Sequence, residues 1–595
     1  MMLAAKRAAK RLVDAQKQTA WRLGMSNRLV RRQIGLMQAL EEVKEAIAPE
    51  APKVNADLTH FKAENEPMFE YLKDSPERKR VQASLARLQS QMTEVPIVVG
   101  DQEKRTRDFR FQVKPFEHRN KLAKFYHASA DIIQDAIAVS IEAQKEWEVT
   151  PLEERAKIFL RAADLVSNKY RADLLAATML GQGKTVWQAE IDAAAELADF
   201  LRMNVQFALE MTRYQPISTT SAKNSMVYRG LEGFVAAVPP FNFTAIGGNL
   251  SAAPALMGNV VLWKPSDTAV LSNYIVFKIF QEAGLPPGVI NFLPADGPTF
   301  GSAVTRSPHL GGINFTGSVS TFQWLWKKVA DNLNTYKNFP RIVGEAGGKN
   351  FHLIHSSADI PHAVNNTIRS AFEYSGQKCS ACSRAYVPDD IWPEFRKQLL
   401  EQHSKIKLGS PVEFDTFMSA VIDERSFERV KSYIEHAHNS KELKVIAGGK
   451  TDKSKGYFIE PTIVDVTTHA KDKIMKEEIF GPVLSIYVYP ANDMEGVVKL
   501  VQTTTPFSLT GAIFAKDESV LEMWRRKLRF AAGNLYINDK STGAVVGQQP
   551  FGGARHSGTN DKAGGPHYLL RWTSEQSVKR GLVPLADWKY KHMVA

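Results

Sequence analysis

Residues 233–263, GFVAAVPPFNFTAIGGNLSAAPALMGNVVLW, contain no charged side chain. A run of this length could cross a lipid bilayer, but Pro239-Pro240 and Gly258-Asn259 divide it into short pieces. The pieces predict a buried strand at 233–238, a helix at 243–257 and a second strand at 259–264. Because apolar strands flanking a helix are typical of a parallel sheet covered on both faces, we predict an α/β core rather than a membrane span.

The sequence on both sides continues this alternation. Downstream, the pattern predicts helices at 271–283 and 320–332 and strands at 290–293 and 312–315, which is the βαβ rhythm of a nucleotide-binding domain. Upstream, residues 1–100 are polar and helical in pattern, and amphipathic helices are predicted at 123–147, 151–168, 170–180 and 184–211. Residues 212–228 resemble an extended hairpin.

A second α/β block is predicted between residues 341 and 539. Its helices are expected at 360–375, 392–402 and 423–439, and its later strands at 486–489, 511–514 and 533–537. A chain of 66.4 kDa with 44% hydrophobic residues can bury a large core, and its length suggests two or more domains.

The formal charge of +12 is concentrated at the start of the chain. Residues 1–32 hold nine Lys or Arg and one acid, a net charge of +8. An Arg-rich, acid-poor start with interspersed Leu, Ala and Trp is typical of a mitochondrial transit peptide. A solvated basic helix and a nucleic-acid-binding arm are the alternatives. Since the rest of the chain offers no nucleic-acid-binding module, we favour targeting to the mitochondrion and expect no nucleic-acid partner.

Both cysteines of the chain, Cys379 and Cys382, lie in residues 373–384. Two cysteines cannot form a disulfide framework, which favours a reducing compartment. A zinc site would need histidine partners, and the nearby His355 and His362 lack the spacing of such ligands. We therefore predict no metal.

A second chemistry-bearing cluster lies just upstream at residues 344–349, GEAGGK. A thiol at Cys379 and a carboxylate at Glu345 are the two halves of a covalent-catalysis cycle, since one can attack a carbonyl and the other can activate water. Asn242 follows a predicted strand at its carboxyl end, where α/β sheets place ligand sites. The alternatives are a buried apolar cysteine, a solvated glutamate and a helix-capping asparagine.

Six clusters in fixed order over about 250 residues resemble the aldehyde dehydrogenases. They are 238–243 (VPPFNF), 263–266 (WKPS), 315–318 (FTGS), 344–349 (GEAGGK), 376–379 (GQKC) and 477–483 (EEIFGPV). The chain more narrowly resembles the mitochondrial Δ1-pyrroline-5-carboxylate, or glutamate γ-semialdehyde, dehydrogenases at 376–384, 541–553 and 557–562. The resemblance implies an α/β aldehyde dehydrogenase fold with a Rossmann-like NAD-binding domain, an α/β catalytic domain and a small oligomerisation element formed by a β-hairpin and the C-terminal tail.

The resemblance also implies a mechanism. The Cys379 thiolate attacks the aldehyde, and Asn242 stabilises the oxyanion together with the Cys379 backbone N–H. Hydride passes to NAD⁺, and Glu345 activates the water that releases the acid from the thioester. No role is implied for Cys382, which we interpret as structural. A CoA-acylating dehydrogenase, the main rival, would use the thiol without needing Glu345.

The cofactor contacts implied by the resemblance lie mostly at the ends of predicted strands. A carboxylate at Asp267 would repel a 2′-phosphate and so favour NAD over NADP. The fingerprint G-x-G-x-x-G is missing, and Phe322 stands where many aldehyde dehydrogenases carry glycine. The implied cofactor residues are Pro239, Lys264, Ser266, Asp267, Gly317, Ser318, Thr321, Glu478 and Phe480.

By the same resemblance, a second group of residues surrounds the substrate. Ser380 and the Gly543-Ala544 loop would hold the α-carboxylate and ammonium of glutamate γ-semialdehyde, although related enzymes often have Ser in place of Ala544. Phe243 and Phe551 would flank the aliphatic chain, with Glu196 in the same cavity, although both rings could also be ordinary core residues. Another short polar aldehyde, such as succinic semialdehyde, is the alternative substrate.

The predicted organisation places the protein in the mitochondrial matrix as a homodimer with no membrane partner, paired through the hairpin and the C-terminal tail. The length of the chain excludes a bifunctional enzyme, because residues 1–100 cannot hold a flavin barrel. The predicted division is an N-terminal targeting extension (1–55), a helical part of the NAD-binding domain (56–211), the oligomerisation hairpin (212–230), the Rossmann-like core (231–340), the catalytic domain (341–540), and the substrate-anchor loop with the oligomerisation tail (541–595).

Overall fold

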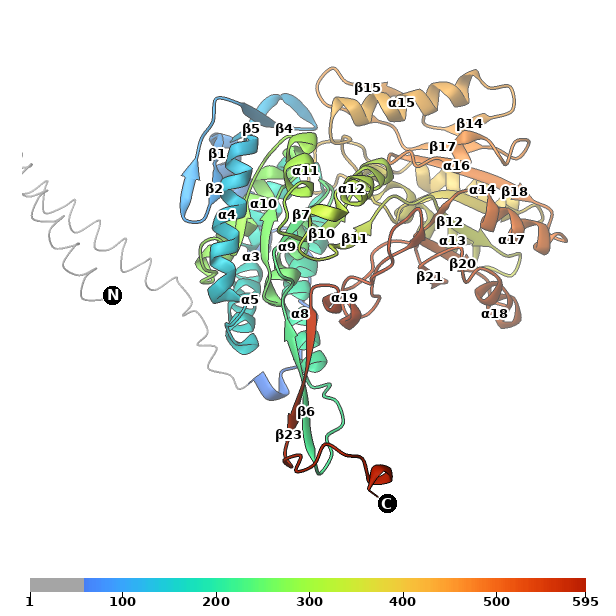
Figure 1. The fold of residues 1–595 in the computed structure, drawn as a ribbon. Coiled ribbons are helices and arrows are strands. Elements are labelled where there is room, and N and C mark those ends of the chain that lie inside the picture. Colours follow the sequence, from blue (N-terminus) through green and yellow to red (C-terminus); the bar gives the residue numbers. More distant parts are fainter. Residues whose placement is uncertain (1–57, 595) are drawn as a thin grey trace, which may run out of the picture. The chain divides into compact units, whose positions relative to one another are not determined.

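A computed structural model describes residues 58–594 (Figure 1). The predicted targeting extension lies outside this range. No helix within 58–594 is long and apolar enough to span a membrane, in agreement with the interpretation of residues 233–263 as separate core elements. That stretch forms β7 (Phe234–Val238), α9 (Thr244–Leu256) and β8 (Val260–Trp263), as predicted.

The first sheet has the strand order β11-β10-β7-β8-β9-β2-β3. The five strands from β11 to β9 in this order run parallel. At the other edge, β2 pairs antiparallel with β9, and β3 pairs antiparallel with β2. The predicted βαβ rhythm is confirmed, with one additional helix, α11. The new elements are β2 (Ile97–Val99), β3 (Gln102–Lys104), α10 (Val270–Glu282), β9 (Ile290–Phe292), α11 (Gly297–Thr305), β10 (Leu310–Thr316), α12 (Val319–Asp331) and β11 (Arg341–Glu345).

The predicted helix at 123–147 is wrong at its start. β5 (Glu117–Tyr126) pairs with β4 (Phe109–Lys114) and β1 (Thr93–Val95), and α4 (Ala130–Trp147) begins only afterwards. The boundary is set by Ser129, whose side chain caps the helix by accepting from the Ile132 N–H at 3.4 Å. Residues 58–100 are likewise only partly helical, with α3 (Pro76–Ser90) as their one α-helix.

One continuous helical run lies beside the first sheet. It consists of α7 (Val186–Ala189), the π-helix η2 (Glu190–Glu196) and α8 (Leu197–Thr212), where a single regular helix is predicted from the sequence. α5 (Leu152–Ser167) and α6 (Arg171–Gln182) pack in the same layer.

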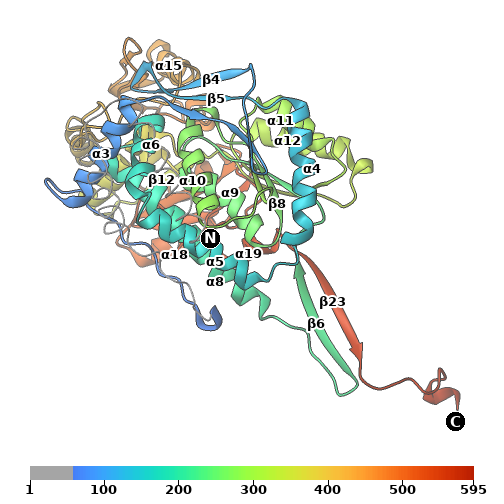
Figure 2. The same ribbon diagram turned by 90° about the vertical axis from the view of Figure 1, so that its left-hand side faces the viewer.

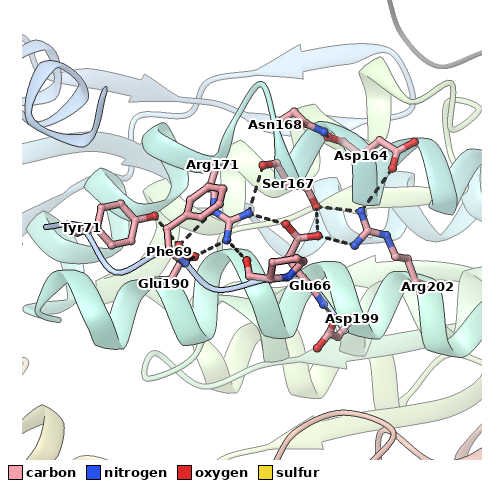
Figure 3. A network of polar contacts seen from close by, with 11 residues as sticks. Glu66, Phe69, Tyr71, Asp164, Ser167, Asn168, Arg171, Glu190, Asp199 and Arg202 are labelled. Atoms are coloured by element: carbon pink, nitrogen blue, oxygen red, sulfur yellow. Dashed lines mark hydrogen bonds and ion pairs between the residues drawn. The ribbon is translucent and has the colours of Figure 1, made fainter. Parts of the chain in front are cut away.

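A buried ion-pair network fixes the start of the π-helix (Figure 3). The Arg171 guanidinium lies between the carboxylates of Glu66 and Glu190, and these three side chains are at most 8% exposed. Tyr71 Oη donates to Glu190 at 2.6 Å, and the Phe69 N–H donates to the same carboxylate at 2.8 Å. The network therefore holds the extended segment at 66–71 against α6 and η2.

The second sheet has the order β14-β17-β18-β13-β12-β20-β21, and only β14 is antiparallel to its neighbour. Adjacent residues of β12, such as Leu353 and Ile354, belong to separate apolar cores because successive side chains point to opposite faces. The strands are β12 (Asn350–Ile354), β13 (Cys382–Pro388), β14 (Lys444–Ala447), β17 (Thr462–Asp465), β18 (Val483–Tyr489), β20 (Thr510–Phe514) and β21 (Asn534–Ile537).

The predicted helices of this second block are confirmed in position. One of them, α13 (Ile360–Phe372), ends three residues earlier than predicted, because Tyr374 and Ser375 adopt left-handed backbone angles. The other α-helices are α14 (Trp392–His403), α15 (Glu424–Asn439), α16 (Lys473–Lys476), α17 (Met494–Thr503), α18 (Glu518–Lys527) and α19 (Pro566–Leu570). Short strand pairs are β15 (Thr451–Asp452) with β16 (Phe458–Ile459), and β19 (Phe507–Ser508) with β22 (Ala554–Arg555).

A two-stranded ribbon projects from the rest of the described chain (Figures 1 and 2). It consists of β6 (Ala222–Arg229) and β23 (Ser574–Gly581), paired antiparallel. The turn of the predicted hairpin at 212–228 is present, since Thr219 and Ala222 exchange backbone hydrogen bonds at 2.8 and 3.4 Å, but the strand that pairs with β6 comes from the C-terminal part of the chain. Pairing between strands so distant in sequence leaves no local turn signal that could predict it.

Candidate active site

The three candidate catalytic residues come from three different elements. Glu345 is the last residue of β11, Asn242 follows β7, and Cys379 lies in the loop before β13. The Cys379 Sγ lies 3.5 Å from Glu345 Oε1. The fold thus brings the thiol and the carboxylate together where the chain crosses from the first sheet to the second.

Backbone hydrogen bonds on both sides fix the position of Glu345. Its carbonyl accepts from the Gly317 N–H at 3.1 Å, and the following Ala346 N–H donates to the Ser557 carbonyl at 2.9 Å. Burial raises the pKa of the carboxyl to about 7, although the hydrogen bond from Cys379 and the charge of Lys562 act in the opposite direction. A carboxyl with this pKa can exchange protons near neutral pH, as a general base requires.

Cys379 lies in a strained loop. Tyr374 and Ser375 have φ values of 53° and 54°, and a Cβ on Gly376 would lie 2.3 Å from the Gly481 carbonyl oxygen. Burial, followed by the charges of Glu345 and Glu478, raises the pKa of the Cys379 thiol well above its usual value. The thiol is therefore protonated at neutral pH until a base removes the proton.

Cys382 has a different environment. It is 2% exposed and packs in the apolar core around α13, and its thiol donates to the Arg384 carbonyl at 3.6 Å. Burial raises its pKa to about 12. This environment fits the predicted structural role. Among residues 58–594, no cluster of three or more His, Cys, Asp or Glu could hold a metal ion.

Asn242 is 3% exposed and faces the nucleophile loop. Its Nδ2 donates to the Gln377 carbonyl at 3.0 Å. The alternative role as a helix cap is not what the structure has, because the Thr244 and Ala245 N–H groups at the start of α9 donate to Asp192 at 2.9 and 2.8 Å. An amide carries two N–H donors, and the bond to Gln377 uses one of them.

A cavity of ≈ 400 Å³ opens at the carboxyl ends of β7 and β8. Lys264 and Thr321, two predicted cofactor contacts, line it. Ser318 caps α12 by accepting from the Thr321 N–H at 3.3 Å, and Gly317 precedes it. Pro239 is buried directly after β7. The other lining residues are Val238, Gly297, Pro298, Phe300, Gly301, Ser320, Trp324 and Leu325.

The predicted cofactor contacts Ser266 and Asp267 lie at the turn after β8, next to Lys264 of this cavity. Lys264 donates to the Pro265 carbonyl at 3.1 Å, and burial lowers its pKa. Asp267 Oδ2 lies 3.0 Å from His127 Nε2, while Asp267 Oδ1 is buried and has no hydrogen-bond partner in the described chain. Because buried acceptors are normally satisfied, this oxygen suits a hydroxyl donor from a ligand. Ser266 Oγ lies 3.3 Å from Thr268 Oγ1 at the same turn.

Glu478 contacts the GEAGGK cluster, and its charge acts on the Cys379 thiol. Glu478 Oε1 accepts from the Gly348 N–H at 2.8 Å, and a Cβ on Gly347 would lie 2.1 Å from Glu478 Oε2. Burial raises the pKa of Glu478 to about 7. Phe480 packs edge-on against Phe241 with ring centroids 5.9 Å apart. Gly347 therefore makes room for the Glu478 carboxylate, whereas Gly348, where a Cβ would lie 2.3 Å from the Cys379 carbonyl oxygen, makes room for the nucleophile loop.

The predicted substrate residues lie on several elements around Cys379. Ser380 Oγ lies 2.7 Å from Thr542 Oγ1, which ties the nucleophile loop to the anchor loop at 541–553. In that loop Gly543 has φ 85° and is exposed, and Ala544 is half-buried. Burial raises the pKa of Glu196 well above its usual range, and the charges of Asp192 and Glu345 add to the shift. Phe243 is the N-cap of α9, and Phe551 lines a cavity of ≈ 30 Å³ that includes Glu345.

Comparisons with known proteins agree with this geometry. The pattern of the Aldehyde dehydrogenase family matches residues 103–578. The chain belongs to the aldehyde dehydrogenase family. It is 59% identical over 530 residues to the mitochondrial Δ1-pyrroline-5-carboxylate dehydrogenase of Danio rerio, covering 89% of this chain and 95% of that protein. The corresponding Homo sapiens protein is 58% identical over 534 residues, covering 90% and 95%.

Solved structures show the same likeness for this aldehyde dehydrogenase. The Δ1-pyrroline-5-carboxylate dehydrogenase of Mycobacterium tuberculosis bound with NAD superposes with a TM-score of 0.87 at 43% identity. That comparison covers 91% of this chain and 100% of the other. A Thermus enzyme of the same name with bound NAD gives a TM-score of 0.83 at 31% identity, covering 88% and 99%.

The fold accounts for the departure at Phe322. Its ring stacks on Phe315 with centroids 5.6 Å apart, and a Cβ on Gly344 would lie 2.1 Å from the Phe322 ring. The aromatic side chain thus fills the space beside Gly344 at the end of β11, next to Glu345. The missing side chain at Gly344 leaves the space that the large Phe322 ring occupies.

Three polar residues of this aldehyde dehydrogenase site are absent from the sequence-based predictions. Thr542 contacts Ser380, as described above. Lys562 Nζ donates to the Gly533 and Gly552 carbonyls at 2.8 and 3.0 Å, and its charge acts on Glu345. Lys184 forms a fully buried ion pair with Asp192. Thr542 and Lys562 lie within the segments 541–553 and 557–562 that carry the narrower resemblance, but nothing in those segments marks their contacts, and no motif marks Lys184.

Proposed function

We propose that this chain is an NAD-dependent Δ1-pyrroline-5-carboxylate dehydrogenase that oxidises L-glutamate γ-semialdehyde to L-glutamate in proline catabolism. The observation that supports this most directly is the 3.5 Å contact between Cys379 Sγ and Glu345 Oε1, with the Ser380–Thr542 contact beside it. The names of the relatives described above support the choice of substrate.

In the first half of the proposed reaction, Cys379 gives its proton to a water molecule, and its sulfur forms a bond to the aldehyde carbon. The carbonyl oxygen becomes an oxyanion, which accepts from the second N–H of Asn242 and from the Cys379 backbone N–H. Such donors contribute roughly 10²–10³ in turnover each. When bound, NAD⁺ would be held by Lys264, Asp267 and Glu478 and would accept the hydride that leaves the former aldehyde carbon when the oxyanion collapses to a thioester.

In the second half, Glu345 takes a proton from a water molecule whose oxygen attacks the thioester carbon. The carbon–sulfur bond then breaks, which releases the carboxylate product and leaves Cys379 as a free thiolate. The raised pKa of Glu345 suits this step, because the carboxyl can accept a proton near neutral pH and release it again. One chain needs both a thiol and a carboxylate for this reason.

An NAD(P)-dependent dehydrogenase of another short polar aldehyde, such as succinic semialdehyde, is the second candidate. The two substrates differ at the end away from the aldehyde, where only glutamate γ-semialdehyde carries an ammonium next to its carboxylate. The half-buried Glu196 near the site favours a substrate with an ammonium, because a cation beside this carboxyl would offset the raised pKa and stabilise the carboxylate.

We propose the mitochondrial matrix as the location and a homodimer as the assembly. The animal relatives are named mitochondrial, which supports the location. The β6–β23 ribbon and the exposed apolar residues after it support pairing between two copies. The His127–Asp267 contact, which holds an acidic oxygen beside the ribose position, supports NAD over NADP.

A substrate panel tests the proposal. The purified protein is mixed with NAD⁺ or NADP⁺, without CoA, and pyrroline-5-carboxylate, succinic semialdehyde or simple alkanals. We expect NADH formation with the highest kcat/KM for pyrroline-5-carboxylate. Cys379→Ala should abolish NADH formation while NAD binding is retained, and Cys382→Ala is the matched thiol control. Faster turnover of succinic semialdehyde, or a strict need for CoA, would refute the assignment.

A further inference from the structure

A fully buried cation lies beside the candidate oxyanion donor. Lys184 precedes α7, and its side chain is 0% exposed. Its Nζ donates to Asp192 Oδ2 at 2.8 Å. An ammonium with this burial is stable only when it is paired, and nothing in the aldehyde-oxidising chemistry described above uses it. Its position therefore needs an explanation.

The Lys184 ammonium connects segments that carry the candidate catalytic groups. It lies 4.0 Å from the centre of the Phe243 ring, directly after Asn242. It also lies 4.8 Å from the centre of the Tyr374 ring, at the turn that begins the Cys379 loop. Cations over aromatic faces are held by the ring quadrupole, and this attraction is stronger when both groups are desolvated.

Its partner Asp192 continues the connection. The two Asp192 oxygens accept from the Thr244 and Ala245 N–H groups, which start α9 two and three residues after Asn242. A carboxylate at a helix N-terminus also interacts favourably with the helix dipole. Asp192 lies within the π-helix Glu190–Glu196, and such distortions occur frequently at functional sites.

The π-helix itself is held at its first residue. The network of Figure 3 fixes Glu190 through Arg171, Tyr71 and the Phe69 N–H. Asp192 is two residues further on, so its carboxylate is presented to Lys184 and α9 from an anchored backbone. The buried ion-pair network thus fixes the backbone of the π-helix, and Asp192 on that helix fixes the residues next to Asn242.

We propose that Lys184 is a positioning residue for the oxidation step: through Asp192 and Phe243 it sets the Asn242 amide at the distance from Cys379 that oxyanion stabilisation requires. This rests on the proposed function only in that an aldehyde is the substrate. Lys184 does not touch the reacting atoms. Its effect is exerted through Asn242, which is already aimed at the Cys379 loop by the bond from Nδ2 to the Gln377 carbonyl.

The test compares Lys184→Met with Asn242→Ala and the double variant Lys184→Met/Asn242→Ala. The readouts are the rate of the first NADH turnover, the KM for NAD⁺ and the thermal midpoint. Loss of an oxyanion donor lowers the rate roughly 10²–10³-fold, so we expect Asn242→Ala in that range and Lys184→Met to lose at least about tenfold. The KM for NAD⁺ should change less than about threefold, because neither Lys184 nor Asn242 is among the predicted cofactor contacts.

Non-additivity is the decisive result. If Lys184 acts through Asn242, adding Lys184→Met to Asn242→Ala should lower the rate by no more than about threefold, because a missing amide cannot be misplaced further. Rate losses that multiply in the double variant would overturn the proposal. So would a first-turnover rate in Lys184→Met that is within about threefold of the wild type.

Two further variants separate positioning from stability. Lys184→Met leaves Asp192 as an unpaired buried charge, so Lys184→Met/Asp192→Asn is made alongside it and should regain thermal stability without regaining the rate. Lys104→Met makes the same substitution on β3, where it removes the ion pair with Asp135 outside the buried ion-pair network, and is the control. Full recovery of the rate in Lys184→Met/Asp192→Asn, or an equal loss in Lys104→Met, would show a merely structural role.

The comparison uses whichever aldehyde the wild-type protein oxidises. A failure of the substrate assignment is then visible in the wild type, whereas a failure of this inference is visible only in the variants.

Discussion

We expect the ionisation of the Glu345 carboxyl to control the pH dependence of the reaction. Burial raises its pKa to about 7, and only the carboxylate can accept a proton from water. Below that pH, hydrolysis of the thioester should slow by about tenfold per pH unit. Glu345→Gln should release about one NADH per site in a burst and then stall at every pH. Stopped-flow NADH absorbance checks both, and steady turnover in the variant would contradict the assigned role.

The same pKa has a consequence for stability. The folded-state pKa of Glu345 lies above its unfolded value, so the folded protein binds more protons between about pH 4.5 and 7. As pH rises through that window, ionisation of Glu345 lowers the free energy of unfolding. Glu345→Gln should therefore raise the thermal midpoint at about pH 8 but not at about pH 4. Glu148→Gln, at an exposed position, is the control. If Glu345→Gln and the wild type had the same thermal midpoint at about pH 8, the burial argument would be contradicted.

The candidate catalytic residues could be predicted because each lies in an unusual local sequence. Glu345 is surrounded by glycines that leave room for Glu478 and Phe322, and Asn242 follows two prolines after an apolar strand. Lys184 and Asp192 are different. They are one lysine and one aspartate in an ordinary helical pattern, where the usual expectation is a solvated pair. Only the π-turn and the packing of α9 put both charges inside the protein.

At the scale of elements, periodicity predicted the parallel strands and most helices, but it failed where two patterns overlap. Residues 122–126 include Leu122, Ala123, Phe125 and Tyr126, which are buried and could serve a helix or a strand. Pairing with β4 and β1 decides for the strand, and this pairing is not local. The π-helix was also not predictable, because its three consecutive alanines at 193–195 give no clear apolar period in which an extra residue per turn could be recognised.

The anchor loop offers a prediction at this scale. Gly543 and Gly547 have φ values of 85° and 81°, and a Cβ on either would approach a flexible side chain, Lys540 or Met203. Replacing either with Ala should cost about 1–2 kcal/mol of unfolding free energy, because a left-handed backbone disfavours a Cβ. Only Gly543→Ala should also raise the KM for pyrroline-5-carboxylate, by about tenfold for the loss of one well-placed hydrogen bond.

Gly547→Ala is the matched control for this prediction, since it carries the same backbone strain in the same loop. Steady-state kinetics at saturating NAD⁺ and chemical denaturation measure the two effects separately. Equal KM values for the two variants would remove Gly543 from the substrate site.

At the scale of the whole molecule, the site depends on the junction between two sheets. Glu345 ends a strand of the first sheet, and five residues later Asn350 begins a strand of the second. Asn350 Nδ2 donates to the Cys379 carbonyl at 2.6 Å, so the second sheet holds the nucleophile while the first holds the base. Sequence clusters could indicate the members of this site, but their distances follow from how the two sheets are joined.

The C-terminal end of the chain carries the last prediction. Beyond the β6–β23 ribbon, Leu582, Val583, Leu585, Trp588 and Tyr590 are between 52% and 85% exposed. A run of exposed apolar side chains on a projecting ribbon is typical of a surface that another chain covers. We therefore expect the full-length protein to be a dimer and a chain truncated after residue 581 to be a monomer, as measured by light scattering during size-exclusion chromatography.

The truncation leaves both strands of the ribbon in place, and the candidate catalytic and substrate residues all precede it, the last being Phe551. The kcat of the truncated chain should therefore remain within about threefold of the full-length value if each subunit works alone. Trp588→Ser/Tyr590→Ser, which keeps the length of the chain, should weaken dimerisation without removing the tail. A full-length monomer, or a truncated chain that still elutes as a dimer, would contradict pairing through this surface.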